Sequence, residues 1–540
     1  MGGKHQMKHL LPIMIILLLV STSFVGVGNQ VRELMVDNQD FAESLFYTGN
    51  HHLYSDEWNK TFGGPNSDCG YCVIQTNGDG YAIIGETTSY GAGIHDVWLI
   101  KTDSDGNEEW NKTYGGADWD IGYSIIQTDE GGYAITGQTS SYGAGMLDAW
   151  LIKTDLDGNE EWNKTYGGIE GDTGSFLQQT NDDGFVIVGS SESYVSDGCA
   201  WIIKTDSTGK ELWNTTIVTS DHSHAYSIEQ TSDGGYILTG WVYKGWDVLL
   251  VKLDADGNEE WRKTFGSSGC EIGYSVHQTK DEGYIITGYT SSYGAEDDNI
   301  WLIKTDSDGN KEWDKTYGGK NREKGYSCQI TDDDGYIIVG ITAEPDQYPS
   351  DILLIKTDSA GNKQWEKVFG KAKFDIGNSI QQVSDGGYVI TGYTGQNIGL
   401  NYDVILIKVA AFDNQRPNKP TITGKTEGRT KKEYEYKIVT TDPEDNDVYY
   451  FINWGSIGYY TGQIETDFIG PYVSGEEVII NHTWWYRDNF TIKVMAIDAY
   501  GGESDFATLK VTIPKINNLW CYLAWLDRFP LLQRLFEVLI

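Results

Sequence analysis

The chain has 540 residues, more than a single hydrophobic core usually supports, so two or more domains are expected. It carries 40 basic and 79 acidic side chains, and the resulting net charge of −39 argues against nucleic acid as a partner. The 65 Gly, 35 Tyr and 19 Trp residues, with only 39% hydrophobic residues, favour an all-β protein built from many short strands and turns.

Residues 1–28 begin with basic residues, continue as the apolar run LLPIMIILLLV and end in small residues. This order is typical of a secretory signal peptide and predicts a secreted or extracellular protein tethered to the cell surface. An uncleaved signal anchor is the alternative, because the apolar run counted through Val27 is just long enough to span a bilayer. Residues 29–51 carry no pattern and are interpreted as a linker.

Residues 52–413 contain a long repeat. Its landmark tryptophans are spaced by 52, 52, 51, 48, 52 and 52 residues and are Trp58, Trp110, Trp162, Trp213, Trp261, Trp313 and Trp365. Each unit has four strand patterns separated by Asp-Gly or Gly-Gly turns, which in the second unit cover 122–128, 133–139, 148–155 and 160–167. Four strands in a repeat of this length predict one propeller blade.

The two ends of the repeat are complementary. No Trp strand follows the last DVILIKVA strand at 403–410, whereas the strand around Trp58 precedes the first complete unit. Pairing of these two strands would complete the last unit and remove both exposed sheet edges. The predicted fold is therefore all-β: a seven-bladed β-propeller closed by the N-terminal strand, followed by an Ig-like β-sandwich and a short C-terminal amphipathic helix.

The segments DSDGNEEW and DSTGKELW, which end at Trp110 and Trp213, place a Gly turn four residues before the Trp. This pattern resembles the tryptophan-docking repeat of quinoprotein-like propellers and of related secreted prokaryotic cell-surface proteins. The resemblance implies that the landmark tryptophans pack between neighbouring units as structural residues. The resemblance does not extend to the cofactor or calcium ligands of a quinone dehydrogenase, so no such ligands are assigned in this sequence.

Variable connections between the strands are expected to lie together on one face, because alternate connections of antiparallel strands emerge at opposite ends. A binding surface is predicted there. The candidate stacking residues in these connections are Tyr90, Trp119, Tyr142, Trp241, Tyr243, Trp246, Tyr293 and Tyr348.

An acidic residue precedes the innermost strand of six units. These residues are Asp68, Asp120, Asp172, Glu271, Glu323 and Asp375, and the fourth unit has Ser223 instead, flanked by two His. If these carboxylates circle a channel mouth, they favour binding of a hard cation, with Ca²⁺ as the candidate. No other cofactor is assigned. The alternative is a turn-stabilising Asp that was copied with the repeat.

Cysteine residues do not recur at equivalent positions of the repeat. Cys69 and Cys72 form a lone CxxC without a second pair. Because a structural zinc site needs four ligands, unpaired or opportunistically bridged thiols are the favoured interpretation.

Asn-x-Thr sequons are candidate glycan acceptors in a secreted protein and occur at Asn59, Asn111, Asn163, Asn214, Asn481 and Asn489. No Gly-x-Ser-x-Gly or HExxH motif is present, and no catalytic residue is assigned. The sequence therefore favours a protein without enzymatic activity.

Residues 416–514 begin with the Pro-rich linker RPNKPTITGKTEG and then read as a β-sandwich. Their INWG, HTW and DNFTIKVMAIDAYG elements resemble a PKD or fibronectin-type Ig-like module, which implies a spacer. Residues 515–540 show leucines at helical spacing interrupted by Pro530 and charges, which predicts an amphipathic segment on a membrane or a partner. A helix folded back on the sandwich is the alternative.

The predicted function is non-catalytic binding or adhesion outside the cell, with the variable loops presented to a glycan, an envelope polymer or a surface protein. Membrane contact is expected through the N-terminal apolar run and the C-terminal segment. One alternative is a secreted lyase or hydrolase that uses the channel-mouth carboxylates, and another is a structural envelope component.

Overall fold

The computed structural model describes residues 58–514 except 196–197, 218–221, 244, 295–296, 345–349, 371–373, 398–399, 412–413 and 458–463. All regular elements in this part of the chain are β-strands, and none of it forms a helix that would cross a membrane. The expected signal or anchor at 1–28, the linker at 29–51 and the amphipathic segment at 515–540 lie outside the described residues.

Residues 58–409, here called the sheet array, form seven four-stranded antiparallel sheets. In spatial order the strands are β2 (Asp68–Gln75), β3 (Tyr81–Thr87), β4 (Asp96–Thr102) and β5 (Glu108–Tyr114) in sheet 1; β6 (Asp120–Gln127), β7 (Tyr133–Thr139), β8 (Asp148–Thr154) and β9 (Glu160–Tyr166) in sheet 2; β10 (Asp172–Gln179), β11 (Phe185–Ser191), β12 (Cys199–Thr205) and β13 (Glu211–Ile217) in sheet 3; and β14 (Ser223–Gln230), β15 (Tyr236–Val242), β16 (Asp247–Leu253) and β17 (Glu259–Phe265) in sheet 4. The others are β18 (Glu271–Gln278), β19 (Tyr284–Thr290), β20 (Asn299–Thr305) and β21 (Lys311–Tyr317) in sheet 5; β22 (Arg322–Ile330), β23 (Tyr336–Ala343), β24 (Ser350–Thr357) and β25 (Lys363–Phe369) in sheet 6; and β26 (Phe374–Gln382), β27 (Tyr388–Asn397), β28 (Leu400–Val409) and β1 (Trp58–Phe62) in sheet 7.

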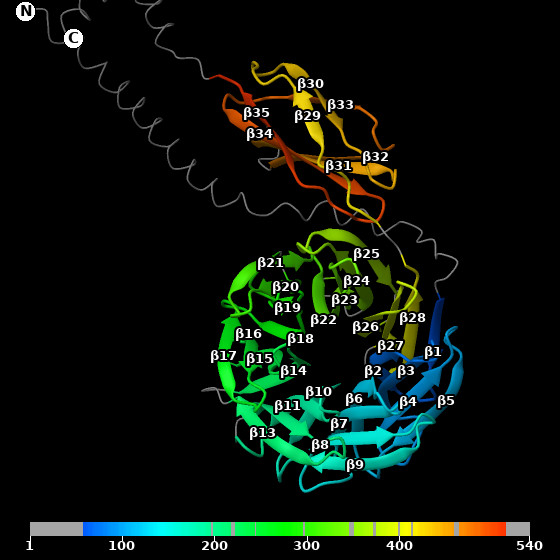
Figure 1. Cartoon of the computed structure of the whole chain (residues 1–540). Helices are drawn as coiled ribbons and strands as arrows, with labels where there is room; N and C mark the ends of the chain where they lie inside the picture. The colour runs from blue at the N-terminus through cyan, green and yellow to red at the C-terminus, as the bar shows by residue number, and fades with distance from the viewer. Residues whose placement is uncertain are drawn as a thin grey trace, which may run out of the picture.

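The first strand of each sheet lies nearest the centre of the array (Figure 1). These innermost strands contact one another in the order β2, β6, β10, β14, β18, β22 and β26, and β26 contacts β2. As expected from the two ends of the repeat, β1 pairs with β28, with Trp58 opposite Lys408 and Phe62 opposite Val404. Sheet 7 therefore joins the beginning and the end of the array.

The predicted closed seven-bladed propeller with a C-terminal helix is nevertheless wrong. No sheet in the described part of the chain closes on itself, because each hydrogen-bonded ladder ends at its fourth strand. Neighbouring sheets meet through the side chains on their faces and form no common backbone ladder, so each sheet keeps two edges. The described residues also contain no helix, and the segment 515–540, where one was expected, lies outside them.

The landmark tryptophans pack between neighbouring sheets. Trp110 of sheet 1 meets Tyr133 of sheet 2 with ring centroids 6.2 Å apart, and the other six tryptophans repeat this contact. The Trp110 ring also lies under Gly158, where an added Cβ would come within 2.6 Å of it. Gly158 has φ +73°, so this turn needs Gly both for its backbone conformation and for the close approach of the ring.

Glutamine side chains link the sheets at the side of the Asp-Gly turns. The Gln127 Oε1 of sheet 2 accepts a hydrogen bond from the Asn77 N–H in a turn of sheet 1, at 2.8 Å. Backbone N–H groups in the turns of other sheets donate equivalent hydrogen bonds to Gln179, Gln230, Gln278, Gln382 and Gln75. The repeated Gln-Thr dipeptide thus satisfies turn donors that would otherwise be left to solvent.

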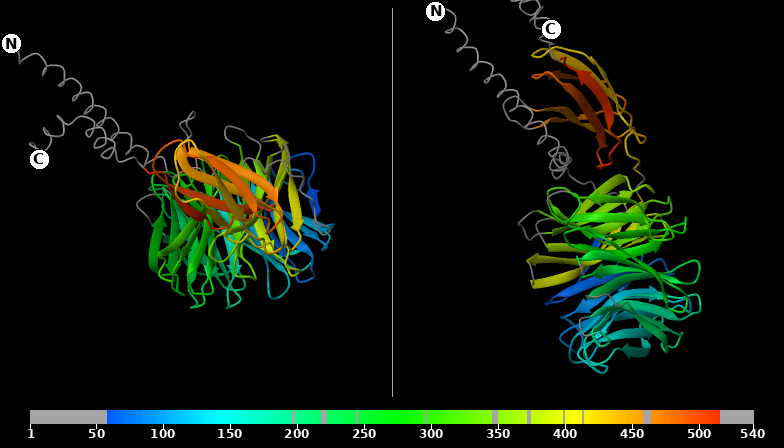
Figure 2. Two further views of the ribbon diagram at one scale, coloured as in Figure 1. Left: turned by 90° about the horizontal axis from the view of Figure 1, so that it is seen from above. Right: turned by 90° about the vertical axis from the view of Figure 1, so that its left-hand side faces the viewer.

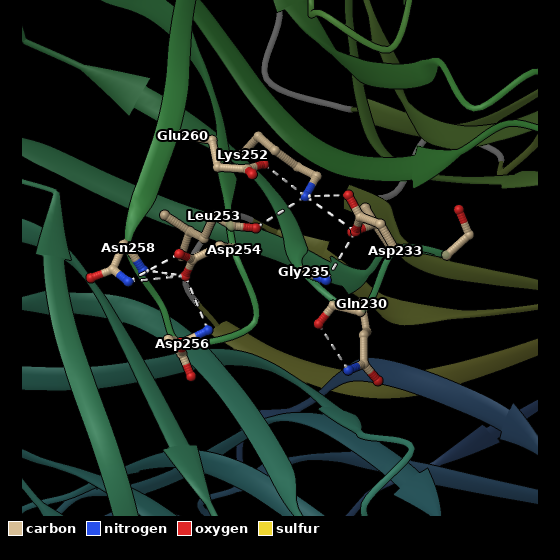
Figure 3. A network of polar contacts seen from close by, with 12 residues as sticks. Gln230, Asp233, Gly235, Lys252, Leu253, Asp254, Asp256, Asn258 and Glu260 are labelled. Carbon is tan, nitrogen blue, oxygen red and sulfur yellow. Dashed lines mark hydrogen bonds and ion pairs between the residues drawn. The ribbon is translucent and has the colours of Figure 1, made fainter.

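A lysine on the third strand braces the turns of each sheet, and this lysine is buried in six of the seven sheets. In sheet 4, Lys252 donates to Asp233, to Glu260 at 3.2 Å and to the Leu253 carbonyl at 3.1 Å (Figure 3). Burial acts to raise the pKa of Asp233, but the Thr231 hydroxyl and Lys252 outweigh it and lower the pKa to about 2. Lys252 is therefore paired while its aliphatic part is buried.

The C-terminal part forms a sandwich of two sheets. One sheet has β29 (Thr421–Gly424), β30 (Glu433–Val439) and β33 (Val478–Thr483), and the other has β32 (Ile464–Tyr472), β31 (Val448–Ile457), β34 (Asn489–Asp498) and β35 (Ala507–Thr512). Their shared core contains the buried Trp454 and Trp484. The sandwich lies beside β25 at the rim of the array (Figures 1 and 2).

The sandwich covers part of the β25 edge. The Glu366 N–H donates to the Tyr500 carbonyl at 3.2 Å, and Asn414 bridges the Gln364 carbonyl and the Asp498 carboxylate at 2.9 and 2.7 Å. Tyr500 also packs against the cluster around Trp365, which is the one fully buried landmark tryptophan among the described residues. The sandwich is thus docked on sheet 6 rather than only tethered to it.

This docking predicts the effect of Tyr500→Ala. Loss of the ring removes about 2 kcal/mol of apolar contact, so the Glu366 amide should exchange its hydrogen roughly thirtyfold faster. Hydrogen–deuterium exchange of a peptide covering β25 measures this, with Tyr486→Ala, an exposed tyrosine of the sandwich, as the control. Equal exchange in both variants would show that Tyr500 does not hold the domains together.

Candidate functional site

The six predicted carboxylates are buried, with at most 5% of each residue exposed. Asp120 shows the pattern: it accepts hydrogen bonds from the Thr139 and Ser141 hydroxyls and from the Gly116 N–H, the last two at 2.6 and 2.8 Å. Asp68, Asp172, Glu271 and Glu323 likewise bind a hydroxyl of the second strand and a preceding N–H. The carboxylates therefore fasten loops to strands within their own sheets.

The structure does not gather these carboxylates into one site. Within the described ranges, no group of three or more His, Cys, Asp or Glu is arranged to hold a metal ion. Sequence reasoning missed a second acid at the start of several third strands. Asp96, Asp148 and Asp247 are examples, and each interacts with the predicted acid of the next sheet. In sheet 6, burial and Asp375 raise the pKa of Asp351 to about 6. The five cysteines of this region are free thiols, and Cys521 lies outside it.

Three of the predicted stacking tyrosines hold the loops in place. Tyr90, Tyr142 and Tyr293 each lean on a Trp of their own sheet, with ring centroids 5.2–5.5 Å apart. Their hydroxyls donate to the backbone carbonyls of Gly63, Gly115 and Gly266 at 2.9, 2.9 and 3.1 Å. These three residues remain 39–45% exposed, while Tyr348 lies outside the described residues.

Three sequon asparagines also have partners within the sheets. Asn111 accepts from the Trp98 indole at 3.2 Å and donates to Glu108 at 2.6 Å, and Asn163 and Asn214 repeat both contacts. Asn111 and Trp98 also line a cleft of about 520 Å³. Asn59, Asn481 and Asn489 have exposed side chains.

The seven sheets differ most at one cross-strand pair. This pair joins the second residue of the repeated first-strand segment to the sixth residue of the second strand, and it is Cys69–Glu86, Ile121–Gln138, Thr173–Ser190, His224–Trp241, Ile272–Tyr289, Lys324–Ile341 and Ile376–Tyr393. The adjoining pair is Gly–Gly in six sheets and Ala–Gly in sheet 4. Because all seven copies share one backbone, a position that varies this freely does not serve the common architecture.

We call these pairs the divergent positions. They lie on the first and second strands of each sheet, next to the strand ends where the variable loops begin. Comparing the seven copies column by column would have revealed them in the sequence.

The divergent position of sheet 4 continues into an aromatic platform, made of His222, Trp241, Tyr243 and Trp246. Trp241 stacks with Trp246 at 4.7 Å between centroids and with His222 at 5.1 Å, and Tyr243 meets Trp246 edge-on at 5.1 Å. Tyr243 and Trp246 remain 51% and 38% exposed. The structure thus brings together three of the eight predicted stacking residues.

Backbone contacts fix the platform. The Tyr243 N–H donates to the His222 carbonyl at 2.8 Å, and the Trp246 carbonyl accepts from the Glu271 N–H of sheet 5 at 2.6 Å. Trp246 has φ +58°, a left-handed conformation that costs a bulky side chain about 1–2 kcal/mol. Strain of this kind at an exposed aromatic residue is typical of functional sites.

A second polar group lies in sheets 1 and 2. His95 Nδ1 is 2.8 Å from Glu86, which also accepts from the Tyr71 hydroxyl at 2.8 Å, and the hydrogen bond to Glu86 raises the pKa of His95. Trp119, another of the predicted stacking residues, stacks on His95 at 4.1 Å between ring centroids. This group offers an ion pair and one exposed indole rather than a continuous aromatic surface.

No protein-family model matches the chain, and no curated protein matches it either. Among solved structures, the PKD domain of an M14-like peptidase from Thermoplasmatales archaeon SCGC AB-540-F20 is 43% identical over 19% of this chain and all of that domain, with a TM-score of 0.17. A small part of this chain is PKD-like. Alpha-2-macroglobulin of Escherichia coli, activated by porcine elastase, is 8% identical over 85% of this chain and 44% of its own, with a TM-score of 0.15.

The C-terminal sandwich contributes none of the divergent positions. Its INWG and DNFTIKVMAIDAYG elements correspond to β31 and to β34 with the turn that follows it. The sandwich contacts the array at β25, whereas the aromatic platform lies in sheet 4. The candidate site therefore belongs to the sheet array alone.

Proposed function

We propose that the protein binds a saccharide on the aromatic platform of sheet 4, as a secreted or cell-surface binding protein without catalytic activity. The observation that carries this proposal is the exposed, strained Trp246 stacked with Trp241 beside Tyr243. The apolar face of a sugar ring packs on such rings, and their polar edges accept or donate hydrogen bonds.

The extracellular location rests on the basic and apolar pattern of residues 1–28. A kinship of the repeat with quinoprotein-like tryptophan-docking repeats is part of the same proposal, and its support is the packing of six of the seven landmark tryptophans on a Gly turn. We do not propose a lyase or hydrolase, because the carboxylates on which that alternative depended are buried and hydrogen-bonded within their sheets.

The test is Trp246→Gly. Gly accepts φ +58° without strain, so the variant should fold with little change in melting temperature while it loses the exposed ring. We expect binding to polysaccharides to weaken at least tenfold, or about 1.4 kcal/mol. Affinity electrophoresis of the full chain against dextran, mannan, xylan, polygalacturonate and alginate measures this.

The matched control is Trp485→Ala, which removes an exposed Trp from the PKD-like domain. It should bind as the unmodified chain does. Binding that survives Trp246→Gly, or that falls equally in both variants, would contradict a saccharide site on the platform.

A further inference from the structure

Sheet 3 carries small hydroxyl side chains where other sheets carry larger groups. Ser175 occupies a position that is Tyr in five of the seven sheets. Two residues earlier, Thr173 pairs with Ser190, and their Oγ atoms lie 3.2 Å apart. We call Thr173, Ser175 and Ser190 the polar wall. All three residues are half-buried.

His224 joins the polar wall to the aromatic platform. Its Nε2 is 2.9 Å from Ser175 Oγ, and its cross-strand partner is Trp241 of the platform. Its ring also lies 4.4 Å from the ring of Tyr226, whose hydroxyl accepts from the Trp241 indole at 3.4 Å. Since β10 and β11 of sheet 3 both contact β14, the wall and the platform are neighbouring parts of one surface.

The chemistry of this surface suits hydroxyl groups better than anions. Ser and Thr hydroxyls both donate and accept hydrogen bonds, as sugar hydroxyls do. Burial and the neighbouring His222 lower the pKa of His224 to about 4, so its imidazole is neutral at pH 7. The wall therefore offers no cation to a carboxylate or sulfate, and the chain's net charge of −39 repels polyanions as a whole.

We infer that the polar wall and His224 form a second half of the saccharide site and select a neutral saccharide, binding its hydroxyls while its apolar ring face packs on the platform. This inference rests on the proposed function, because it needs the platform to hold a sugar. It adds the class of ligand and assigns a binding role to four residues of sheets 3 and 4.

The test compares a variant of the wall with its counterpart in sheet 2. Thr173→Val with Ser190→Ala removes two hydroxyls and little volume, and Ser175→Tyr fills the wall with the residue found at this position in five sheets. Ile121→Val with Gln138→Ala changes the equivalent pair of sheet 2 and is the matched control. Each full-length variant is titrated against dextran, mannan and xylan as neutral probes and against polygalacturonate and alginate as acidic probes.

We expect the unmodified chain to bind at least one neutral probe and to bind it better than either acidic probe. Both wall variants should weaken this binding about tenfold, and the sheet 2 control should not. Unchanged binding in the folded wall variants, together with loss in Trp246→Gly, would overturn the inference and leave the proposed function standing. Preferred binding of an acidic probe would also overturn it, and binding of no probe would overturn both.

Discussion

Gly137→Ala should destabilise the sheet array by about 3 kcal/mol, near the upper end for overpacking a well-packed interior. An added Cβ at Gly137 would lie 1.8 Å from the Ile121 carbonyl oxygen on the neighbouring strand. Because the obstacle is backbone rather than a mobile side chain, β6 and β7 would have to separate. The result would appear as a lower melting temperature and as earlier unfolding in urea.

Gly78→Ala is the control for this prediction, since nothing lies within 4 Å of an added Cβ there. We expect its stability to change by less than about 0.5 kcal/mol. The equivalent glycines of the other six sheets, where the gap is 1.7–1.9 Å, should repeat the effect of Gly137→Ala. If the Gly137→Ala protein had the same melting temperature as the unmodified chain, β6, which is bulged between Gly122 and Ser124, would have room to shift.

Glu323→Gln should stabilise the protein at alkaline pH by a few kcal/mol and leave it unchanged near pH 4. Burial raises the pKa of Glu323 to about 8, although the Thr342 hydroxyl and the Gly319 N–H act in the opposite direction. The folded state therefore keeps a proton that the unfolded chain releases above about pH 4.5. Stability is fully present below that pH and falls as the pH rises towards 8.

Gln resembles the protonated carboxyl group, because it is uncharged and offers an oxygen acceptor beside a donor group, the amide NH2. In the variant this source of pH dependence disappears. Urea unfolding at pH 4, 6 and 8.5 measures the difference, and Glu435→Gln, at an exposed position of β30, is the control. Parallel pH profiles for Glu323→Gln and the unmodified chain would show that Glu323 is ionised when folded.

Much of the local structure could be predicted from periodicity and turn residues. The strands expected at 122–128, 133–139, 148–155 and 160–167 correspond to Asp120–Gln127, Tyr133–Thr139, Asp148–Thr154 and Glu160–Tyr166. Repetition made this prediction strong, because each unit independently showed the same four patterns. The pairing of the strand around Trp58 with the last unit followed from the unequal ends of the repeat and is confirmed.

The candidate site could be predicted only in part. Trp241, Tyr243 and Trp246 were expected to offer aromatic surface, and they do lie together, but His222 and the polar wall were missed. Tyr90 and Tyr142 appeared equivalent to them in the sequence, yet each hydroxyl is bonded to a glycine carbonyl. A loop tyrosine and a binding tyrosine look alike until the position of the preceding loop is known.

The sequence by itself determined the all-β class, the seven units, their strands and the PKD-like module, because these depend on neighbours along the chain. Only the tertiary structure decided that the sheets stay open at both edges, that Asp120 and its equivalents are buried, and that sheets 3 and 4 form one surface. The physical reason is that contacts between sheets join residues about 50 positions apart. Whether an acid or an aromatic ring faces solvent or a hydroxyl is set by those contacts and not by local pattern.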